Sequence, residues 1–271
     1  MNKNLFAELI NLLMLSTLLI SCNNTNDEQY EKLRDGWVLE WEENFDSLLD
    51  TTVWEKESGG KYGLNRYMDS NEELYILNDG KLILRGMKNP LGENTTPFLT
   101  GGISRNILRK NEVARIEIKA SMYAVSGGRF FIRLLPEDNK SEIAINVLQQ
   151  YDSDDFIYQS VTTEYTTEKK MADNPPSVIM VGVEPNRYHI YGIERYHDSL
   201  VFFVDGVRTR KYPRILTQIA GQFPFKDLDL NLHVGVGINK DLDSIALPVD
   251  LFIDWVRYYT PAPSPDIQGR Q

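Results

Sequence analysis

The sequence predicts an all-β protein, a jelly-roll sandwich of two antiparallel sheets. Three observations lead to this prediction. Apolar and polar residues alternate with a period of two in many short segments, tight-turn sequences separate several of these segments, and helical periodicity is nearly absent. Because residues 37–260 contain no linker, repeat or low-complexity block, we expect one large domain over this range.

The expected strands follow one another at short intervals along the chain. In order, they are residues 81–85, 114–119, 129–135, 142–148, 188–193, 200–204, 228–236 and 249–259. The runs Asn78-Asp79-Gly80 and Asp205-Gly206 are typical of tight hairpin turns. Residues 215–220 are the one segment in which we expect a short turn of helix. Residues 261–271, rich in proline, are expected to form a flexible tail.

Composition excludes several classes of function. The chain has 271 residues, of which 42% are hydrophobic, so it can bury a sizeable core. Its net charge of −10 argues against a nucleic-acid partner and against electrostatic docking on anionic lipid. A single cysteine rules out an internal disulfide and a zinc site built on several cysteines. We expect no cofactor to be required.

The first residues have the character of an export signal. Residues 1–21 combine Lys3 with a short apolar stretch, and the run Leu19-Ile20-Ser21-Cys22 resembles the lipobox of bacterial lipoproteins. That resemblance implies acylation of Cys22, with residues 22–36 as a polar tether, and export to a bacterial membrane, most simply the outer membrane. The alternative interpretation is a free, buried cysteine after an ordinary apolar run.

An ordered set of motifs over most of residues 37–260 resembles glycoside hydrolase family 16, which includes laminarinases, agarases and carrageenases. The matching runs are residues 37–45, 78–84, 100–103 with 114–119, 188–194 with 203–206, and 254–259. The resemblance implies a concanavalin-like jelly roll with a concave glycan-binding cleft across one sheet. It implies a polysaccharide as the partner.

The catalytic strand of that family carries the pattern Glu-x-Asp-x-x-Glu when bulged, or Glu-x-Asp-x-Glu when regular. The corresponding run here is residues 141–148, which places Glu142 at the nucleophile position and Ala144 at the position of the middle Asp. The acid/base position falls on Val147 if the strand is bulged and on Asn146 if it is regular. Neither side chain can donate and retrieve a proton, as retaining hydrolysis requires.

The resemblance therefore implies a polysaccharide-binding protein with impaired hydrolysis. Thr162 stands where the family has a histidine facing the cleft, so a further polar group is replaced. Two alternatives stay open. One is an active retaining endo-β-glycanase with a relocated acid/base, for example Asp152 or Glu164. The other is a structural subunit of an outer-membrane glycan-uptake complex.

Aromatic residues of the family's cleft are replaced by arginines. Both family tryptophans of the run at residues 129–136 read as arginine, at Arg129 and Arg133, and a third reads as Arg195. Phe131 shares a face with the first two by alternation. Arginine binds carboxylates and sulfates, so we expect an acidic glycan. The alternative is ordinary salt bridging, including a pairing of Glu142 with Arg129 or Arg133.

Further site residues are implied by the resemblance alone. The loop in which the family contacts sugars contains Tyr62, Asn65, Arg66 and Tyr67. Asp254 and Gly80 match the positions that hold a structural Ca²⁺ in many family members. The three histidines lack metal-ligand spacing and are expected to be structural; they are His189, His197 and His233.

Overall fold

The computed structural model describes residues 33–34, 36–59, 67–92, 96–122, 127–148, 155–238 and 247–263. It divides the chain into two compact units. The smaller unit comprises Met1–Glu40 and Tyr259–Gln271, and the larger comprises Trp41–Tyr258. Within the described ranges, no helix is both long and apolar enough to cross a membrane.

The smaller unit joins the two ends of the chain. Strand β1 (Leu33–Arg34) pairs antiparallel with the first part of β2 (Trp37–Glu43). The backbone N–H of Ala262 donates to the carbonyl of Gly36 at 2.7 Å, and the Thr260 hydroxyl donates to Glu40 at 2.6 Å. Backbone pairing thus ties the described C-terminal residues to β2.

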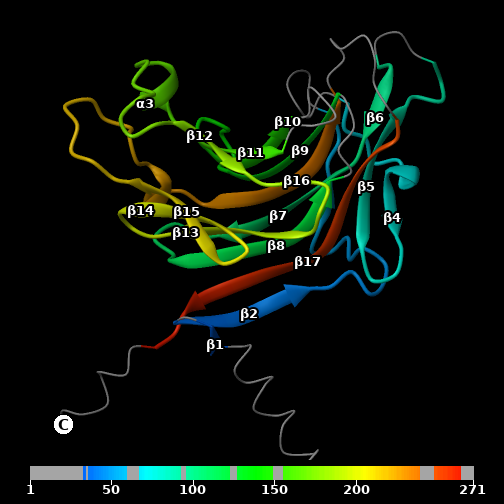
Figure 1. Cartoon of the computed structure of the whole chain (residues 1–271), viewed down its shortest axis with the longest axis horizontal. Coiled ribbons are helices and arrows are strands. Elements are labelled where there is room, and N and C mark those ends of the chain that lie inside the picture. Colours follow the sequence, from blue (N-terminus) through cyan, green and yellow to red (C-terminus); the bar gives the residue numbers. More distant parts are fainter. Residues whose placement is uncertain are drawn as a thin grey trace, which may run out of the picture. The chain divides into compact units, whose positions relative to one another are not determined.

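The larger unit contains two antiparallel sheets that face each other (Figure 1). We call them the β8 sheet and the β10 sheet. The β8 sheet follows the order β2-β17-β8-β13-β14-β15, and β5 extends it by pairing with β17, β4 and β6. Its strands are β2, β4 (Tyr75–Leu77), β5 (Leu82–Lys88), β6 (Phe98–Thr100), β8 (Ala114–Met122), β13 (His189–Arg195), β14 (Ser199–Val204), β15 (Val207–Pro213) and β17 (Val249–Pro261).

The β10 sheet has seven strands in the order β12-β11-β10-β9-β16-β7-β3. Its strands are β3 (Glu55–Lys56), β7 (Gly102–Leu108), β9 (Gly128–Leu135), β10 (Glu142–Leu148), β11 (Phe156–Thr162), β12 (Val178–Gly182) and β16 (Leu230–Ile238). The described helices are short: η2 (Glu72–Leu74), α3 (Glu164–Thr167) and η3 (Phe225–Asp227). The prediction of an all-β sandwich of two antiparallel sheets is confirmed.

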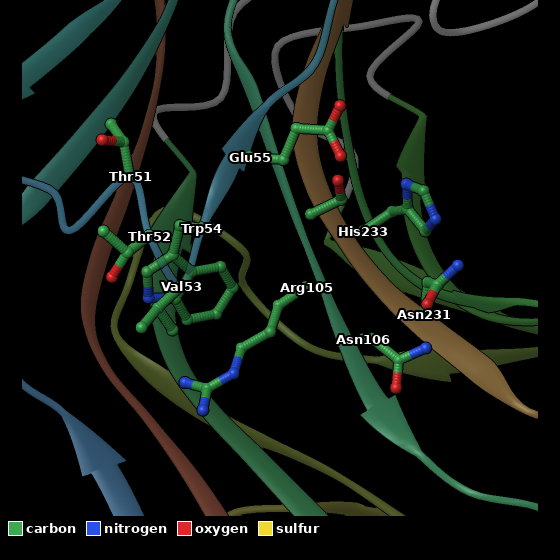
Figure 2. Close-up of a pocket in the computed structure, with 10 residues that line it drawn as sticks. Thr51, Thr52, Val53, Trp54, Glu55, Arg105, Asn106, Asn231 and His233 are labelled. Atoms are coloured by element: carbon green, nitrogen blue, oxygen red, sulfur yellow. The ribbon is translucent and has the colours of Figure 1, made fainter.

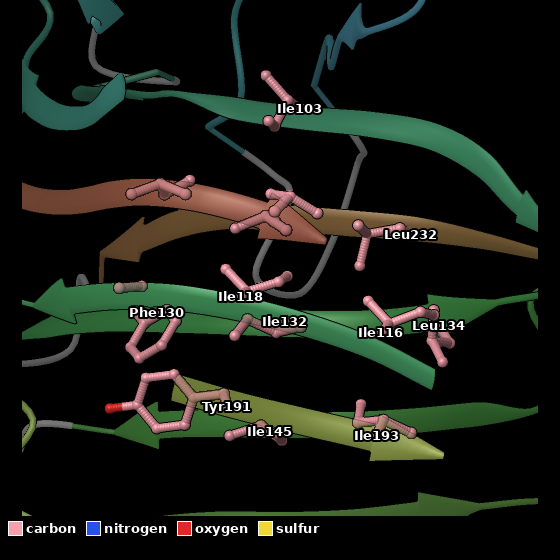
Figure 3. Close-up of a cluster of buried hydrophobic side chains, with 14 of the residues drawn as sticks. Ile103, Ile116, Ile118, Phe130, Ile132, Leu134, Ile145, Tyr191, Ile193 and Leu232 are labelled. Carbon is pink, nitrogen blue, oxygen red and sulfur yellow. The ribbon is translucent and has the colours of Figure 1, made fainter. Parts of the chain in front are cut away.

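The hydrophobic core lies between the two sheets. Ile116 and Ile118 of β8 belong to the same buried cluster as Ile132 and Leu134 of β9 (Figure 3). All four side chains are at most 3% exposed, and each contributes about 1.5–3 kcal/mol by leaving water. The period-two alternation of each strand therefore sends one set of side chains into this core and the other set outward.

The predicted hairpin turns are confirmed, but the predicted helix is wrong. Asp79 and Gly80 both have positive φ, as do Asp205 and Gly206, which is the backbone of a tight two-residue turn. Residues 215–220 form an irregular loop, in which the Gln222 side chain accepts from the Ile215 N–H and donates to a nearby carbonyl. Helix α3 forms instead at residues 164–167, where Thr163 and Thr166 make a capping box.

One glycine is required by close packing. A Cβ at Gly101 would lie 2.7 Å from the backbone oxygen of Leu74, which cannot yield as a side-chain end can. We expect Gly101→Ala to lower the free energy of unfolding by about 1–3 kcal/mol in denaturant titration. Gly182 is the matched control, since a Cβ there meets nothing within 4 Å. Equal losses in both variants would contradict this explanation.

Candidate functional site

The predicted reaction strand is a regular strand in the middle of the β10 sheet. Ile143, Ile145 and Val147 belong to the core cluster, so Glu142 and Asn146 lie on the opposite side, which we call the outer face. Pairing with β11 runs without a register shift from Glu142 to Asn146. The strand is therefore not bulged, and Asn146, not Val147, shares a face with Glu142.

Neighbouring strands bring other predicted residues to the same face. In the register of the sheet, Ala144 lies opposite Arg133 of β9, and Asn146 lies opposite Phe131. Thr162 of β11 lies opposite Glu142. Arg129 is two residues from Phe131 and shares its side of β9, because the intervening Phe130 belongs to the core. The expected common orientation of Arg129, Phe131 and Arg133 is thus observed.

Glu142 is held in an ion pair. Its Oε1 lies 3.1 Å from Nε of Arg133, and the two side chains are 27% and 11% exposed. The Arg133 guanidinium also lies 4.1 Å from the centre of the Phe131 ring. Burial lowers the pKa of Arg133, while the negative charges of Glu142 and Glu57 oppose that shift. The carboxylate at the nucleophile position is therefore neutralised by a neighbouring cation.

Two positions beside Glu142 carry no carboxyl group. Ala144 is fully buried, and Asn146 donates from Nδ2 to the Ser160 hydroxyl at 3.3 Å. The Oδ1 atom of Asn146 is buried and has no hydrogen-bond partner among the described residues. A carboxamide can orient a sugar hydroxyl, but it cannot give up and recover a proton at neutral pH. Of the outer-face positions 142, 144 and 146 of β10, only Glu142 thus carries a carboxyl group.

A histidine–glutamate pair on this face was not anticipated. His233 of β16 lies opposite Arg133, and its Nδ1 is 2.6 Å from Oε1 of Glu57. Its outward position follows from the alternation of β16, in which Leu232 and Val234 are in the core. The alternation of β16 could have predicted from the sequence that His233 lies on the outer face. Glu57 follows β3 and has no alternation pattern that would predict its position.

Glu57 and Glu142 share a neighbouring cation. The Glu57 carboxylate is held by His233 on β16, and its negative charge also acts on Arg133 of β9, which is paired with Glu142. Glu164, considered as a relocated acid/base, lies in α3, where its carboxylate is 3.8 Å from Nζ of Lys169.

A pocket of about 360 Å³ lies at the β3 edge of the β10 sheet (Figure 2). Strands β3, β7 and β16, together with the segment preceding β3, contribute its walls. It is lined by Thr51, Thr52, Val53, Trp54, Glu55, Ser104, Arg105, Asn106, Asn231 and His233. Most of these side chains can form hydrogen bonds, as expected of a site for a polar ligand.

Arg195 does not belong with the outer-face residues, which corrects its expected role in glycan binding. It lies in β13 of the β8 sheet and is 1% exposed. Its guanidinium donates to the backbone carbonyls of Arg109, Glu112, Phe225 and Leu228. Four hydrogen bonds from the fork hold these segments together, so Arg195 has a structural role.

The two predicted calcium positions lie near each other on the sheet, and one of them takes part in an ion pair. Ile253 of β17 lies opposite Leu82, which places Asp254 one step from the turn that contains Gly80. However, the Asp254 carboxylate is ion-paired with the ammonium group of Lys119. Calcium takes six to eight oxygen ligands, and the described residues contain no cluster of three metal-ligating side chains. A calcium ion bound by Asp254 would have to displace Lys119 from this carboxylate.

Other predicted site residues are placed as follows. Tyr67 is 6% exposed and packs edge-on against Phe98 with ring centres 5.5 Å apart, so it is part of the packing. The remaining residues lie outside the described ranges, and they are Cys22, Tyr62, Asn65, Arg66 and Asp152.

Solved structures share this architecture. No protein-family model and no curated protein matches the chain. The laminarinase from Rhodothermus marinus is similar at a TM-score of 0.70 and 19% identity, covering 84% of this chain and 98% of that one. The laminarinase from Flavobacterium sp. UMI-01 is similar at a TM-score of 0.67 and 19% identity, covering 82% of this chain and 100% of that one.

A third similar structure belongs to an enzyme of glycoside hydrolase family 16. SCLam, a non-specific endo-β-1,3(4)-glucanase from glycoside hydrolase family 16, matches at a TM-score of 0.70 and 16% identity, covering 84% of this chain and 92% of that one. These identities are low, so the likeness concerns the fold. The chain has the jelly-roll fold of the laminarinases and endo-glucanases of glycoside hydrolase family 16.

Proposed function

We propose that this protein binds a polysaccharide on the outer face of the β10 sheet and hydrolyses it poorly or not at all. One observation carries the proposal. On the outer face of β10, Glu142 is paired with Arg133, and the two positions that should complete the catalytic set are Ala144 and Asn146. The fold is one that serves glycan-acting enzymes, while position 146, where the resemblance places the proton donor of a regular strand, is an asparagine.

The expected reduction in the rate of hydrolysis can be given in orders of magnitude. General acid/base assistance contributes about 10²–10⁴ to the rate of such a reaction. A nucleophile neutralised by Arg133 loses reactivity in addition, because its charge is already stabilised in the ground state. Binding does not depend on these groups, since hydroxyl and carboxamide side chains and half-buried aromatic rings remain on the outer face, as at Ser160, Asn146 and Tyr158.

We further propose that the protein works from a membrane surface. The lipobox-like run ending at Cys22 supports acylation, and a chain anchored in this way could capture glycan for neighbouring uptake proteins. Metabolic labelling with a palmitate analogue tests this part of the proposal. Incorporation should require Cys22 and be lost in Cys22→Ser.

The test of the main proposal is a polysaccharide panel measured in two ways. Laminarin, agar, porphyran and carrageenan are each assayed for reducing-end release and for retardation of the protein in affinity gels. We expect retardation by at least one polysaccharide without reducing-end release. Tyr158→Ala should weaken that retardation about tenfold or more, because Tyr158 lies opposite Asn146 on the outer face.

The control is Trp255→Ala, which removes an aromatic ring from β17 in the β8 sheet. It should leave retardation unchanged. Turnover that disappears in Glu142→Gln would instead establish an active glycanase. No retardation by any polysaccharide, together with a stable partner protein in pull-down, would favour a structural subunit.

A further inference from the structure

The pocket at the β3 edge contains Arg105, which forms no ion pair with any described residue. The guanidinium carbon of Arg105 lies 3.8 Å from the centre of the Trp41 ring and 5.6 Å from that of Trp54. Over the described part of the chain, no hydrogen bond or ion pair engages this guanidinium. By contrast, the buried guanidinium of Arg115 bonds to Glu117 and Glu194.

The two carboxylates whose charges act on Arg105 already accept hydrogen bonds from other donors. The oxygens of Glu43 accept from the Phe45 N–H and the Trp54 indole N–H, each at 3.1 Å. Asp50 Oδ1 accepts from the backbone N–H and the hydroxyl of Thr52, at 2.9 and 2.6 Å. Burial lowers the pKa of Arg105 despite the opposing charges of Glu43 and Asp50. Among the described residues, this half-buried cation therefore lacks the acceptors that usually compensate for burial.

The pocket carries a positive charge at one end and a negative charge at the other. Figure 2 shows Arg105 and Glu55 at opposite ends, with Asn106 and Asn231 along one side. A negatively charged group entering the pocket is attracted to the Arg105 end and repelled from the Glu55 end. The carboxamides can bind neutral hydroxyls beside it. The arrangement therefore suits a sugar that carries one anionic substituent.

We propose that this pocket binds the anionic group of an acidic polysaccharide, with the guanidinium of Arg105 as its donor. The inference rests on the proposed function and names the substrate class. The shared chemistry is an oxyanion able to accept two parallel N–H bonds, supplied by a uronate carboxylate or a sulfate ester. Trp41 restricts the guanidinium by stacking, which lowers the entropy lost when the anion binds.

The experiment compares three polysaccharides by calorimetry and affinity gels: polygalacturonate, carrageenan and neutral laminarin. We expect Arg105→Gln to lose about 10- to 100-fold in affinity for the acidic chain that binds, with laminarin unaffected. Arg257→Gln is the matched control. Arg257 also stacks on a tryptophan, Trp255 at 4.2 Å, but it pairs with Glu42 and does not line the pocket.

The outcomes separate the two proposals. Unchanged affinity in Arg105→Gln overturns the inference. If the variant loses affinity for polygalacturonate, the bound anion is a uronate carboxylate, and if it loses affinity for carrageenan, the anion is a sulfate ester. If the unmodified protein binds no polysaccharide, sodium glucuronate and inorganic sulfate are titrated instead. Binding that depends on Arg105 then supports the pocket while the proposed function fails, and no such binding overturns both. If Arg105→Gln does not fold, Arg105→Lys keeps the charge without the fork and should bind more weakly.

Discussion

The double substitution Ala144→Asp with Asn146→Glu is expected to raise polysaccharide hydrolysis about 10²- to 10⁴-fold over the unmodified protein. It puts three carboxyl groups on one face of β10, together with Glu142. Positions 142 and 146 are about 13 Å apart along a regular strand, and side chains leaning toward each other bring their carboxyls to about 5 Å. That is the separation that retaining hydrolysis needs.

The surroundings favour this gain. Ser160 lies beside position 146 and can donate its hydroxyl to a carboxylate there, as it now accepts from Asn146. Arg133 lies opposite position 144, so a carboxylate introduced there competes with Glu142 for the guanidinium and frees the nucleophile. The measurement is reducing-end release from whichever polysaccharide the unmodified protein retains in affinity gels.

Two controls isolate the chemistry. Ala144→Asp with Asn146→Gln introduces one carboxyl group but no proton donor at position 146, and should stay inactive. Adding Glu142→Gln to the active double variant should abolish turnover. A folded double variant that binds glycan without any gain in rate would refute the assignment of β10 as the former reaction centre.

Replacing the buried Arg195 is expected to be the most destabilising single change. Arg195→Leu removes the donor for four backbone carbonyls, which lie in two loops and cannot turn to water without local unfolding. Each buried acceptor left unpaired costs about 1–3 kcal/mol, and partial relaxation leaves an expected loss of about 3–5 kcal/mol. Thermal unfolding should show a Tm lowered by about 10 °C.

The control for this prediction is Arg208→Leu, an exposed arginine on β15 of the same sheet. It should change stability by no more than about 0.5 kcal/mol. Below its Tm, Arg195→Leu should retain its affinity for glycan, because the side chain lies in the β8 sheet. A variant with normal stability and lost binding would restore Arg195 to the glycan site.

The position of the acid/base illustrates how far sequence reasoning extends. Alternation places Glu142 and Ala144 on one face whatever the neighbours do. The choice between Asn146 and Val147 depends on whether the strand is bulged, and a bulge is a property of pairing with β9 and β11. Only the register, which runs unshifted through Asn146, settles that choice.

The three arginines predicted for the cleft also show which positions the sequence cannot predict. Arg129 and Arg133 lie on the outer face because they alternate with core residues on one strand. Arg195 also follows a strand, but its carbonyl partners come from segments 30 to 86 residues away in sequence. No local pattern indicates that such loops converge on one guanidinium.

Residue order alone determined the all-β class, the tight turns and the absence of carboxyl groups at positions 144 and 146. These are local properties, since side-chain alternation and turn conformations depend on neighbours along the chain. Tertiary structure decided that Arg133 neutralises Glu142, and that Arg105 stacks on Trp41 with no hydrogen-bond acceptor among the described residues. Such pairings arise from contacts between distant strands, where register and burial, not the residue type, select each partner.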